Sequence, residues 1–394
     1  MKGLFIFDQA ISQDCNGYIY DAIFTDAVFS RYLNHVEELT ILVRLRPADM
    51  KIIEERHIPK IDTSRIRVKE VPNLLSVKGL FQYFAARKIV KEEVEKSDII
   101  FVREPSVLES IVSYYARKKN KKYVLEIGGC PWDTFWNQGI KGKIIAPIRY
   151  LSTRISTLQA KYVVYVTNQW LQKRYPTKGE WVACSNVDIK CDVKAYENRI
   201  NKIHLDMKND KQEFIIGSIG DYAVRSKGHK YVIMALKELN NNSEGIVYKY
   251  QIVGSGDKSE SLNIAKKWKV EHYVEFIPPM NHAAILEWLD SLDFYAQPSR
   301  QEGLPRSVIE AMSRGLAIIG AKTGGIPELI REDCVFSNKK SEVTEIVNII
   351  RSIDYKKMLE LAEENFKNAI QYNSDVIEMR RYNFFKKIIS EHRS

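Results

Sequence analysis

The stretch from Leu292 to Ile330, LDFYAQPSRQEGLPRSVIEAMSRGLAIIGAKTGGIPELI, constrains the fold of this chain more than any other. Its first residues, Leu292–Ala296, form a short apolar run that ends just before Pro298, which predicts a buried strand and then a turn. Pro305 suits the first position of a helix, where its missing N–H group costs nothing. The apolar residues that follow at helical spacing are Val308, Ala311 and Met312.

A second unit of the same kind follows directly. Gly315 is expected to end the first helix, and Leu316–Ile319 predicts another buried strand. Gly324 and Gly325 then precede a short helix at Pro327. Two strand–loop–helix units therefore lie side by side, and each offers free backbone N–H groups to an anion.

Two carboxylates frame the first unit. Glu302 lies in the loop before the helix, and Glu310 lies eight positions later, more than one turn inside it. A rise of 1.5 Å per residue separates them by about 10 Å, which is the reach from a sugar to a ribose across a diphosphate. Taken singly, the two residues allow a plainer interpretation, in which Glu310 pairs with Arg314 at i+4 and Glu302 is a loop charge.

The first half of the chain alternates strands with helices. The expected strands are Leu4–Phe7, Leu39–Val43, Ile66–Val71, Asp98–Val102, Tyr123–Glu126 and Tyr162–Val166. The expected helices include Tyr20–Leu33, Gly79–Lys96 and Val107–Lys119. Nearly continuous apolar strands separated by helices predict an α/β fold whose parallel sheet is covered on both faces. Ligands bind such sheets beyond the carboxyl ends of the strands.

The length of 394 residues predicts two domains, each of about 180 to 200 residues. Ser185–Asp210 is polar and loses the strand–helix rhythm, so we expect the domain boundary there. A second sheet is expected to begin at Phe214–Ile219 and to continue with Tyr248–Val253 and Val274–Ile277.

The chain carries a net charge of +10 and has a pI of about 9.1, which favours an acidic partner such as phosphate-bearing substrates, an anionic membrane or nucleic acid. No zinc-finger, ribonucleoprotein or basic–aromatic pattern supports nucleic acid. Five cysteines without a Cys-x-x-Cys pair predict reduced thiols, and no ligand spacing for zinc is present. Without an 18-residue apolar run or a signal peptide, the expected location is the cytoplasm.

Two basic amphipathic segments, Leu75–Lys96 and Ile140–Lys161, mix apolar side chains with Lys and Arg. Such segments can lie in the interface of an anionic membrane. Core-facing helices with solvated basic faces have the same pattern, so both interpretations remain open.

The full string Glu302-Gly303-Leu304-Pro305 through Glu310, followed by Gly324-Gly325-Ile326-Pro327-Glu328, resembles the signature of retaining GT-B glycosyltransferases of glycosyltransferase family 4. The resemblance implies two Rossmann-like doubly wound domains that face each other across a cleft. Residues 1–185 would form the N-terminal acceptor-binding domain and residues 205–371 the C-terminal domain that binds the nucleotide sugar. The last helix, about residues 372–394, would cross back to the first domain.

The resemblance assigns roles in the second domain. Glu302 would hold the sugar hydroxyls or steady the oxocarbenium charge, and Glu310 would accept hydrogen bonds from the ribose. Lys227 would hold the diphosphate together with the backbone around the helix start. Donor contacts are also expected from Gly254, Gly303, Leu304, Pro305 and Arg306.

One departure from the family pattern concerns the charge that helps Lys227. Asp221 stands where relatives carry an arginine after the first glycine of the Gly-Arg…Lys-Gly element. Arg225 is then expected to supply that charge from a shifted position.

The first domain departs from the pattern as well. Many relatives place a donor-contacting histidine after a strand where this chain has Gly128-Gly129-Cys130-Pro131-Trp132-Asp133. Asp133 or Glu126 is the candidate replacement, with a helix cap or a structural acid as the alternative for either. The loop Gln9–Tyr18 contains Gly17, which is expected to approach the donor or to form an ordinary turn. Arg103 is expected to meet an acceptor phosphate or to be paired.

The resulting hypothesis is a retaining, metal-independent glycosyltransferase that moves a sugar from a nucleotide diphosphate sugar to a glycan or polyprenyl-diphosphate-linked acceptor. No cofactor beyond the donor is expected. The role implied is polysaccharide biosynthesis, in capsule, O-antigen, lipopolysaccharide or exopolysaccharide assembly, in the cytoplasm or peripherally on the inner face of the cell membrane. The alternative is a non-catalytic nucleotide-sugar or glycan-binding protein of the same fold.

Overall fold

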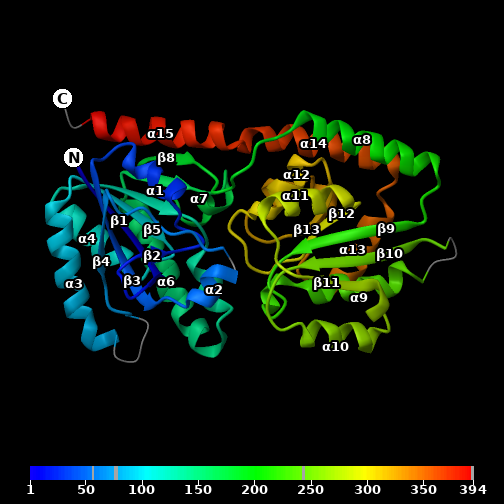
Figure 1. Cartoon of the computed structure of the whole chain (residues 1–394), viewed down its shortest axis with the longest axis horizontal. Helices are drawn as coiled ribbons and strands as arrows, with labels where there is room; N and C mark the ends of the chain where they lie inside the picture. Colours follow the sequence, from blue (N-terminus) through cyan, green and yellow to red (C-terminus); the bar gives the residue numbers. More distant parts are fainter. Residues whose placement is uncertain (56, 75–78, 242–244, 392–394) are drawn as a thin grey trace. The chain divides into compact units, whose positions relative to one another are not determined.

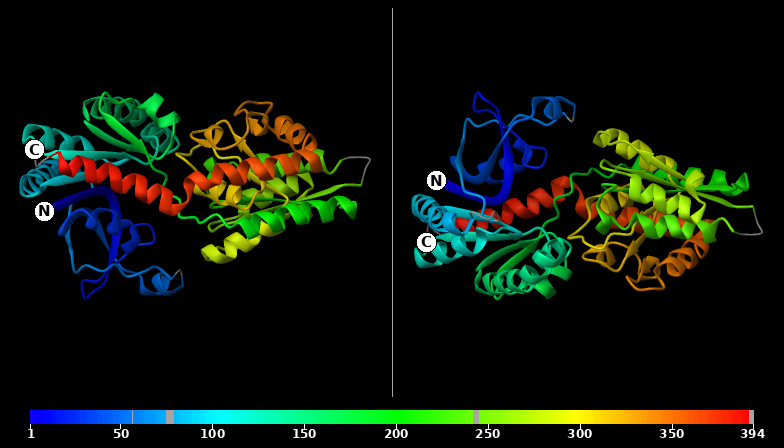
Figure 2. Two further views of the ribbon diagram at one scale, coloured as in Figure 1. Left: turned by 90° about the horizontal axis from the view of Figure 1, so that it is seen from above. Right: turned by 90° about the horizontal axis from the view of Figure 1, so that it is seen from below.

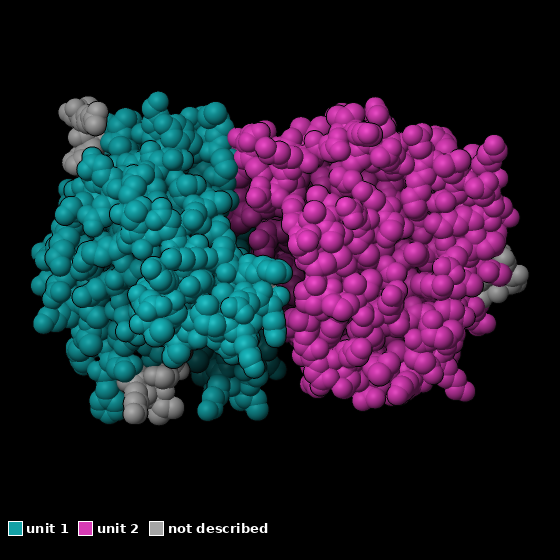
Figure 3. All heavy atoms as spheres, viewed as in Figure 1, with its two compact units in different colours: residues 1–184, 378–394 teal, residues 185–377 magenta. Residues whose placement is uncertain are grey.

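The computed structural model describes residues 1–55, 57–74, 79–241 and 245–391. They form two compact units, coloured separately in Figure 3. The first unit comprises Met1–Cys184 and Glu378–Ser394, and the second comprises Ser185–Ile377. Among the described residues, no helix is both long enough and apolar enough to span a bilayer.

The first unit is built on a sheet of eight strands among its described residues. They are β1 (Lys2–Gln13), β2 (Ile19–Tyr20), β3 (Glu38–Pro47), β4 (Ile66–Glu70), β5 (Ile99–Glu104), β6 (Lys122–Ile127), β7 (Tyr162–Tyr165) and β8 (Glu180–Ala183). The order is β4-β3-β1-β5-β6-β7-β8, and all neighbours in it are parallel. Only β2 is antiparallel, and it pairs with β1 beyond a short connection.

Helices cover both faces of this sheet (Figures 1 and 2). They are α1 (Asp26–Leu33), α2 (Met50–Glu55), α3 (Gly79–Lys96), α4 (Glu109–Lys118), α5 (Pro131–Trp136), α6 (Gly139–Gln159), α7 (Trp170–Arg174) and, from Glu378 onward, α15 (Ser374–Ser390). Helix α4 contacts both α3 and α6. On α15, the ring centre of Phe385 lies 5.1 Å from that of Phe101 on β5 and 6.1 Å from that of Tyr32 on α1. The last helix thus completes the core of the first unit.

The second unit has a parallel sheet of six strands among its described residues, in the order β11-β10-β9-β12-β13-β14. They are β9 (Glu213–Ile219), β10 (Val247–Val253), β11 (Val274–Ile277), β12 (Phe294–Gln297), β13 (Ala317–Ala321) and β14 (Val335–Phe336). The α-helices are α8 (Val193–Lys208), α9 (His229–Leu239), α10 (Ser259–Trp268), α11 (His282–Ser291), α12 (Arg306–Ser313), α13 (Glu342–Arg351) and α14 (Tyr355–Ala369). The short 3₁₀ helices are η1 (Arg225–Lys227), η2 (Glu271–Tyr273), η3 (Ile326–Glu328), η4 (Glu332–Cys334) and η5 (Ile370–Tyr372).

In this unit α9 contacts α10 and α13, whereas α14 contacts α8 and α12, so the sheet again has helices on both faces (Figure 1). The two parallel sheets confirm the predicted doubly wound α/β class.

The loop around Gly17 differs from the expectation. Gly17 does not precede a helix, because β1 and β2 form a hairpin there and α1 begins only at Asp26. The carboxylate of Asp14 accepts the backbone N–H groups of Asn16 and Tyr18, both at 2.9 Å. An aspartate that bonds its own following backbone builds a turn, and Gly17 supplies the positive φ of 84° that this turn needs.

Ser185–Asp210, where we expected the domain boundary, starts where the two units divide, but it does not lose regular structure as predicted, because most of it is α8. Asp192 caps this helix by accepting the N–H of Lys194 at 2.9 Å. The buried face carries Arg199, whose guanidinium donates to the carbonyl oxygens of Leu292 and Leu289 at 2.6 and 2.9 Å. A buried arginine satisfied by backbone carbonyls hides the apolar periodicity on which the sequence prediction relied.

Candidate functional site

The loops that follow β9 and β12 meet at the carboxyl edge of the second sheet, because these two strands are parallel neighbours. Lys227 ends the 3₁₀ helix after β9, and Glu302 lies in the loop after β12. Lys227 Nζ lies 2.9 Å from Glu302 Oε1, and both side chains are partly buried. Two residues that stand 75 positions apart thus form one charged pair where ligands bind such sheets.

Gln297, the last residue of β12, holds Glu302 in place. Its buried amide nitrogen donates to Glu302 Oε1 at 3.0 Å and to Ser299 Oγ at 2.8 Å. Its amide oxygen accepts the hydroxyls of Tyr295 and Ser307, at 3.0 and 3.2 Å. Because both ends of the amide have partners, Glu302 has a fixed orientation. The sequence analysis missed Gln297, although a glutamine at the end of an otherwise apolar strand is the signal that marks it.

Glycine packing brings the two loops together. Gly228 has a φ of +74°, and a Cβ on it would lie 1.9 Å from the carbonyl oxygen of Pro298. The neighbouring backbone also bonds across, because Arg300 N donates to Ser226 O at 2.6 Å. Only glycine allows this approach, and the approach positions Lys227 against Glu302.

The turn before η3 supports the Glu302 loop from the other side. Gly325 N donates to Gly303 O at 2.7 Å. A Cβ on Gly324, whose φ is +57°, would lie 2.2 Å from the carbonyl oxygen of Glu302. The predicted pair of strand–loop–helix units is therefore one packed structure, in which the second unit supports the first.

Helix α12 begins beside this loop. Pro305 is the N-cap, with an extended backbone, and not the first helical residue as predicted; no side chain caps the helix. The first N–H groups of a helix have no partner within the helix, so this end favours an anion. Arg306 is the first residue of α12.

Glu310 lies within α12 and is largely buried. Burial raises the pKa of its carboxyl, while the charges of His282 and Arg306 act in the opposite direction. His282, the first residue of α11, places Nε2 3.7 Å from Glu310 Oε1. The predicted i+4 pair with Arg314 is not formed, because the guanidinium of Arg314 contacts Asp290 instead, with Nε 2.7 Å from Oδ1. No pattern in the sequence pointed to His282, which reaches Glu310 only through the tertiary fold.

The loops after β9 and β10 pack closely. A Cβ on Gly254 would lie 2.0 Å from the carbonyl oxygen of Gly220, so this contact requires glycine. Asp221 accepts the N–H of Ala223 at 2.9 Å, and a Cβ on Gly256 would lie 2.5 Å from Asp221 Oδ1. Where the family pattern has an arginine, this chain has an aspartate that builds the loop.

Arg225 is highly exposed and pairs with Glu260 of α10, with Nε 2.9 Å from Oε2. The structure therefore brings Lys227 to Glu302 and ties Arg225 to a different carboxylate. Across the described residues, no group of three or more His, Cys, Asp and Glu side chains is arranged to hold a metal ion.

The first unit places Asp133 in α5, after the carboxyl end of β6. Burial raises the pKa of Asp133, against the effects of Cys130 and Arg174. Arg174 Nη2 lies 3.9 Å from Asp133 Oδ1, and Arg174 Nε lies 3.1 Å from Cys130 Sγ. This is a looser arrangement than the one around Glu302.

The other sequence candidates of the first unit have simple local environments. Gly17 is exposed at the tip of the β1–β2 hairpin, and a Cβ on it would meet nothing within 4 Å. Arg103 lies over the rings of Phe7 and Phe24, at 5.8 and 5.3 Å from their centres.

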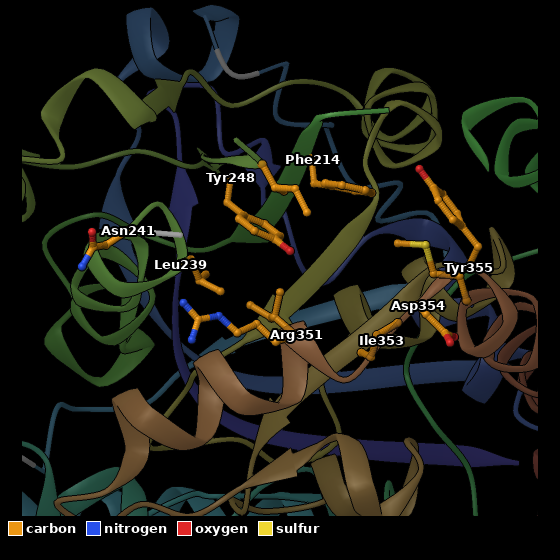
Figure 4. A pocket seen from close by; sticks show the side chains of 11 residues that line it. Phe214, Leu239, Asn241, Tyr248, Arg351, Ile353, Asp354 and Tyr355 are labelled. Carbon is orange, nitrogen blue, oxygen red and sulfur yellow. The ribbon is translucent and has the colours of Figure 1, made fainter. Parts of the chain in front are cut away.

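A hollow of about 620 Å³ lies at the other edge of the second sheet (Figure 4). Phe214 and Tyr248, near the amino ends of β9 and β10, line it together with Leu239, Arg351 and Tyr355. The candidate site lies beyond the carboxyl ends of these strands and the hollow lies at their amino ends, so the hollow does not belong to the candidate site.

Comparisons with known proteins identify the family. The profile of the family described as "Glycosyl transferases group 1" matches residues 199–371. Protein CapJ of Staphylococcus aureus is 31% identical, over 99% of this chain and 97% of its own length. An N,N'-diacetylbacillosaminyl-diphospho-undecaprenol alpha-1,3-N-acetylgalactosaminyltransferase of Campylobacter jejuni is 30% identical over 27% of this chain and 29% of its own length.

The fold is also that of solved structures. Anabaena Alr3699/HepE, crystallised with UDP, superimposes with a TM-score of 0.66 and 17% identity, over 98% of this chain and 100% of that one. The chain has the GT-B fold, and it belongs to the group 1 glycosyltransferases.

Proposed function

We propose that this glycosyltransferase moves a sugar from a nucleoside diphosphate sugar to a hydroxyl of a lipid-linked glycan, with retention at the anomeric carbon, as expected for family 4. The observation that carries the proposal is the contact of Lys227 with Glu302 at the carboxyl edge of the second sheet, 2.9 Å long and fixed by Gln297. A cation and an acid held together there match the two ends of a diphosphate sugar, one anionic and one rich in hydroxyls.

In this proposal, the second unit stabilises the departing diphosphate. The bond from the anomeric carbon to a phosphate oxygen breaks, and a bond to the acceptor oxygen forms on the same face of the sugar. The proton of the acceptor hydroxyl passes to the departing phosphate oxygen. Lys227, the N–H groups at Gly303 and Leu304 before the N-cap Pro305, and the charge of Arg306 would hold the diphosphate. These groups supply positive charge without a metal ion. Arg225 would join them after leaving Glu260, and the Gly254 loop would lie beside the nucleotide.

The two glutamates would divide the rest of the donor between them. Glu302 would accept hydrogen bonds from the sugar hydroxyls and would favour positive charge at the anomeric carbon. Glu310 would accept hydrogen bonds from the ribose. Its burial supports this role, because a ligand that donates two hydroxyls restores the hydrogen bonds that burial removes from a carboxylate.

The first unit, residues 1–185 with the helix that ends the chain, would bind the acceptor. A hollow of about 930 Å³ lies at the carboxyl ends of β3 and β4. Arg44, Arg46, Asn73 and Gln82 line it and offer hydrogen-bond donors to a glycan. The name of the Campylobacter jejuni relative specifies an acceptor on undecaprenyl diphosphate, which supports a lipid-linked acceptor here as well.

Within the same proposal, Asp133 would contact the donor sugar in place of the family histidine, and the Gly17 hairpin would approach the donor. Similarity over about a quarter of the chain to glycosyltransferases named for colanic acid and amylovoran biosynthesis supports a role in surface polysaccharide assembly, in the cytoplasm or on the inner face of the cell membrane.

A thermal-shift screen of the full chain against UDP, GDP, ADP and CMP, their sugars, and NAD tests the donor site. A donor at a hundred times its dissociation constant adds about 2.7 kcal/mol to the unfolding free energy, which gives a clear shift in Tm. We expect one nucleoside diphosphate and its sugars to raise the Tm, and we expect a smaller rise in Glu310→Ala. An unchanged Tm with every nucleotide would contradict the proposal. A Tm shift without turnover would favour the non-catalytic binding protein.

A further inference from the structure

Helix α6 buries small and polar residues in its own unit and exposes large apolar ones. The residues that it buries are small or polar: Gly142, Ala146, Arg149, Thr153, Ser156 and Thr157. Five of its large apolar side chains face solvent instead, and they are Ile140, Ile144, Ile148, Leu151 and Ile155, each between 53% and 81% exposed. We call these five residues the α6 stripe. Their spacing of four, four, three and four places them on one face of the helix, along about 22 Å.

The inward face of α6 is fixed, so the stripe cannot turn toward the core. Arg149 is buried and pairs with the buried Glu104, with Nη2 3.5 Å from Oε2. Thr153 Oγ1 donates to the other oxygen of Glu104, also at 3.5 Å. Gly142 packs directly on the preceding helix, because a Cβ there would lie 2.0 Å from the carbonyl oxygen of Phe135. Rotating the helix would break this buried pair and would replace Gly142 with a larger residue at a place where the backbone of Phe135 leaves no room for one.

The charges around the stripe have one sign. Helix α6 contains no Asp or Glu, and Lys141 and Lys143 are exposed on the two sides of the stripe near its start. Trp136 of α5 is also partly exposed, and Lys143 Nζ lies 5.5 Å from the centre of its ring. An apolar stripe with flanking lysines and a tryptophan at one end matches an anionic lipid interface, where apolar chains lie beneath a negatively charged surface.

Helix α3 shows that this arrangement is not a general property of the unit. It buries Ala86, Val90 and Val94, and its basic residues alternate with Glu92, Glu93 and Glu95. Phe81 and Phe84 are exposed near its start, while residues 75–78 of the predicted segment lie outside the described part of the chain. Of the two segments predicted to contact a membrane, α6 therefore has its apolar face outward, whereas α3 buries an apolar face from Ala86 onward and exposes apolar rings only near its start.

We infer that the α6 stripe, with Lys141, Lys143 and Trp136, is the surface by which this protein lies on an anionic phospholipid bilayer. The helix would lie in the plane of the interface, with the five apolar side chains among the acyl chains and the lysines at the phosphates. The inference rests on the proposed function only in its purpose, which is to bring the first unit to a lipid-linked acceptor.

Co-sedimentation of the full chain with vesicles tests this surface. We expect binding to phosphatidylcholine vesicles that contain phosphatidylglycerol, weak binding to phosphatidylcholine alone, and loss of binding at high salt. Ile148→Glu should lower the affinity about tenfold or more, because it removes an isoleucine that would insert among the acyl chains and adds a negative charge that the anionic lipids repel. Lys141→Gln should lower it about fivefold.

Leu205→Glu is the matched control. Leu205 is an exposed leucine on α8 of the second unit, 58% accessible, so its substitution makes the same change of charge on another helix. It should leave vesicle binding unchanged. Equal loss in Leu205→Glu and Ile148→Glu would overturn the inference, as would no binding by the native protein or binding that Ile148→Glu leaves intact.

Two further measurements distinguish this inference from dimerisation of the chain and from the proposed function. Sedimentation velocity without lipid asks whether the native chain is a dimer that Ile148→Glu dissociates, and that result would replace the bilayer with a second copy of the chain. The donor thermal shift should be the same in Ile148→Glu as in the native protein. Vesicle binding without any response to nucleotides would sustain the lipid surface and contradict the proposed function.

Discussion

The carboxyl edges of the two sheets offer a comparison within one chain. In the second unit, Glu302 contacts Lys227 at 2.9 Å and Gln297 at 3.0 Å, and glycines hold the surrounding loops together. In the first unit, Asp133 lies 3.9 Å from Arg174. The second edge is fixed before any ligand binds, whereas the first depends on a longer contact. Catalytic power in such folds comes mainly from groups that are already oriented, so we expect the second edge to dominate.

The largest effect should come from Glu302→Ala. The substitution removes the carboxylate and leaves Lys227 and Gln297 without their common partner. We expect kcat to fall by about 10²- to 10³-fold, the loss seen when one oriented electrostatic contact is removed from an active site. Steady-state kinetics of donor hydrolysis and transfer would measure it. Glu332→Ala, at an exposed glutamate of the same unit, is the control. Full activity of the double variant Glu302→Ala, Glu310→Ala would contradict the dominance of the second edge.

The next effect tests whether glycine holds the second edge together. Gly228→Ala places a Cβ against the carbonyl of Pro298 at a φ of +74°. We expect a loss of about 2–3 kcal/mol of unfolding free energy, from left-handed strain plus the forced separation of the two loops. Chemical denaturation would measure it. Gly129→Ala is the control, because a Cβ there would meet nothing within 4 Å and φ is not positive. Equal stability of the two variants would show that the loops are not held by this contact.

Glu310→Gln should weaken donor binding by about ten- to a hundredfold, because a charged acceptor contributes more to a hydrogen bond than a neutral one. Isothermal titration with the nucleotide found in the screen would measure it. The affinity of Arg314→Gln, a variant on the same helix outside the site, should be unchanged. A donor affinity that Glu310→Gln does not lower would remove this residue from the site.

The same variant has a pH signature. The folded-state pKa of Glu310 lies above its ordinary value of 4.5, because burial disfavours the charged form. Its contribution to stability is thus fully present below pH 4.5 and is lost as the pH rises through the folded-state pKa. Glu310→Gln abolishes that loss, so its unfolding free energy relative to the native protein should increase as the pH rises above about 4.5. Denaturation curves at several pH values would show the trend, and an opposite slope would mean that the carboxylate is stabilised by its neighbours.

The second unit could be predicted from sequence because its site is encoded almost contiguously. The strand, the Glu302 loop, α12 and the glycine turn follow one another within 39 residues, and their spacing reports their geometry. Lys227 lies outside this stretch, and it was predicted from a separate element of the resemblance, the Gly-Arg…Lys-Gly pattern. His282 was missed because it reaches Glu310 only through tertiary packing, which periodicity does not report. Gln297 was missed although it stands five positions before Glu302, at the end of an apolar strand where a glutamine is itself a signal.

The first unit shows what local patterns leave out. Its parallel sheet followed from the apolar strands, yet the turn of the β1–β2 hairpin is built by two hydrogen bonds that the Asp14 carboxylate accepts. The orientation of α6 was undecided because its apolar stripe suits a core as well as a membrane. A single buried pair, Arg149 with Glu104, decides it, and these residues stand 45 positions apart.

The smallest effect should come from Asp133→Asn, the substitution that sharpens the comparison most. Asparagine keeps the shape and one hydrogen-bond acceptor, so we expect kcat to fall only about three- to tenfold, the range of one neutral hydrogen bond. The pKa of Asp133 is raised above its ordinary value of 3.8 by burial, so the variant should also gain stability relative to the native protein as the pH rises above that value. Kinetics and denaturation on one preparation separate the two roles. A stability change with an unaltered kcat would make Asp133 a structural acid, whereas a loss as large as that of Glu302→Ala would show that the looser edge tightens around the bound donor and that both edges share the chemistry.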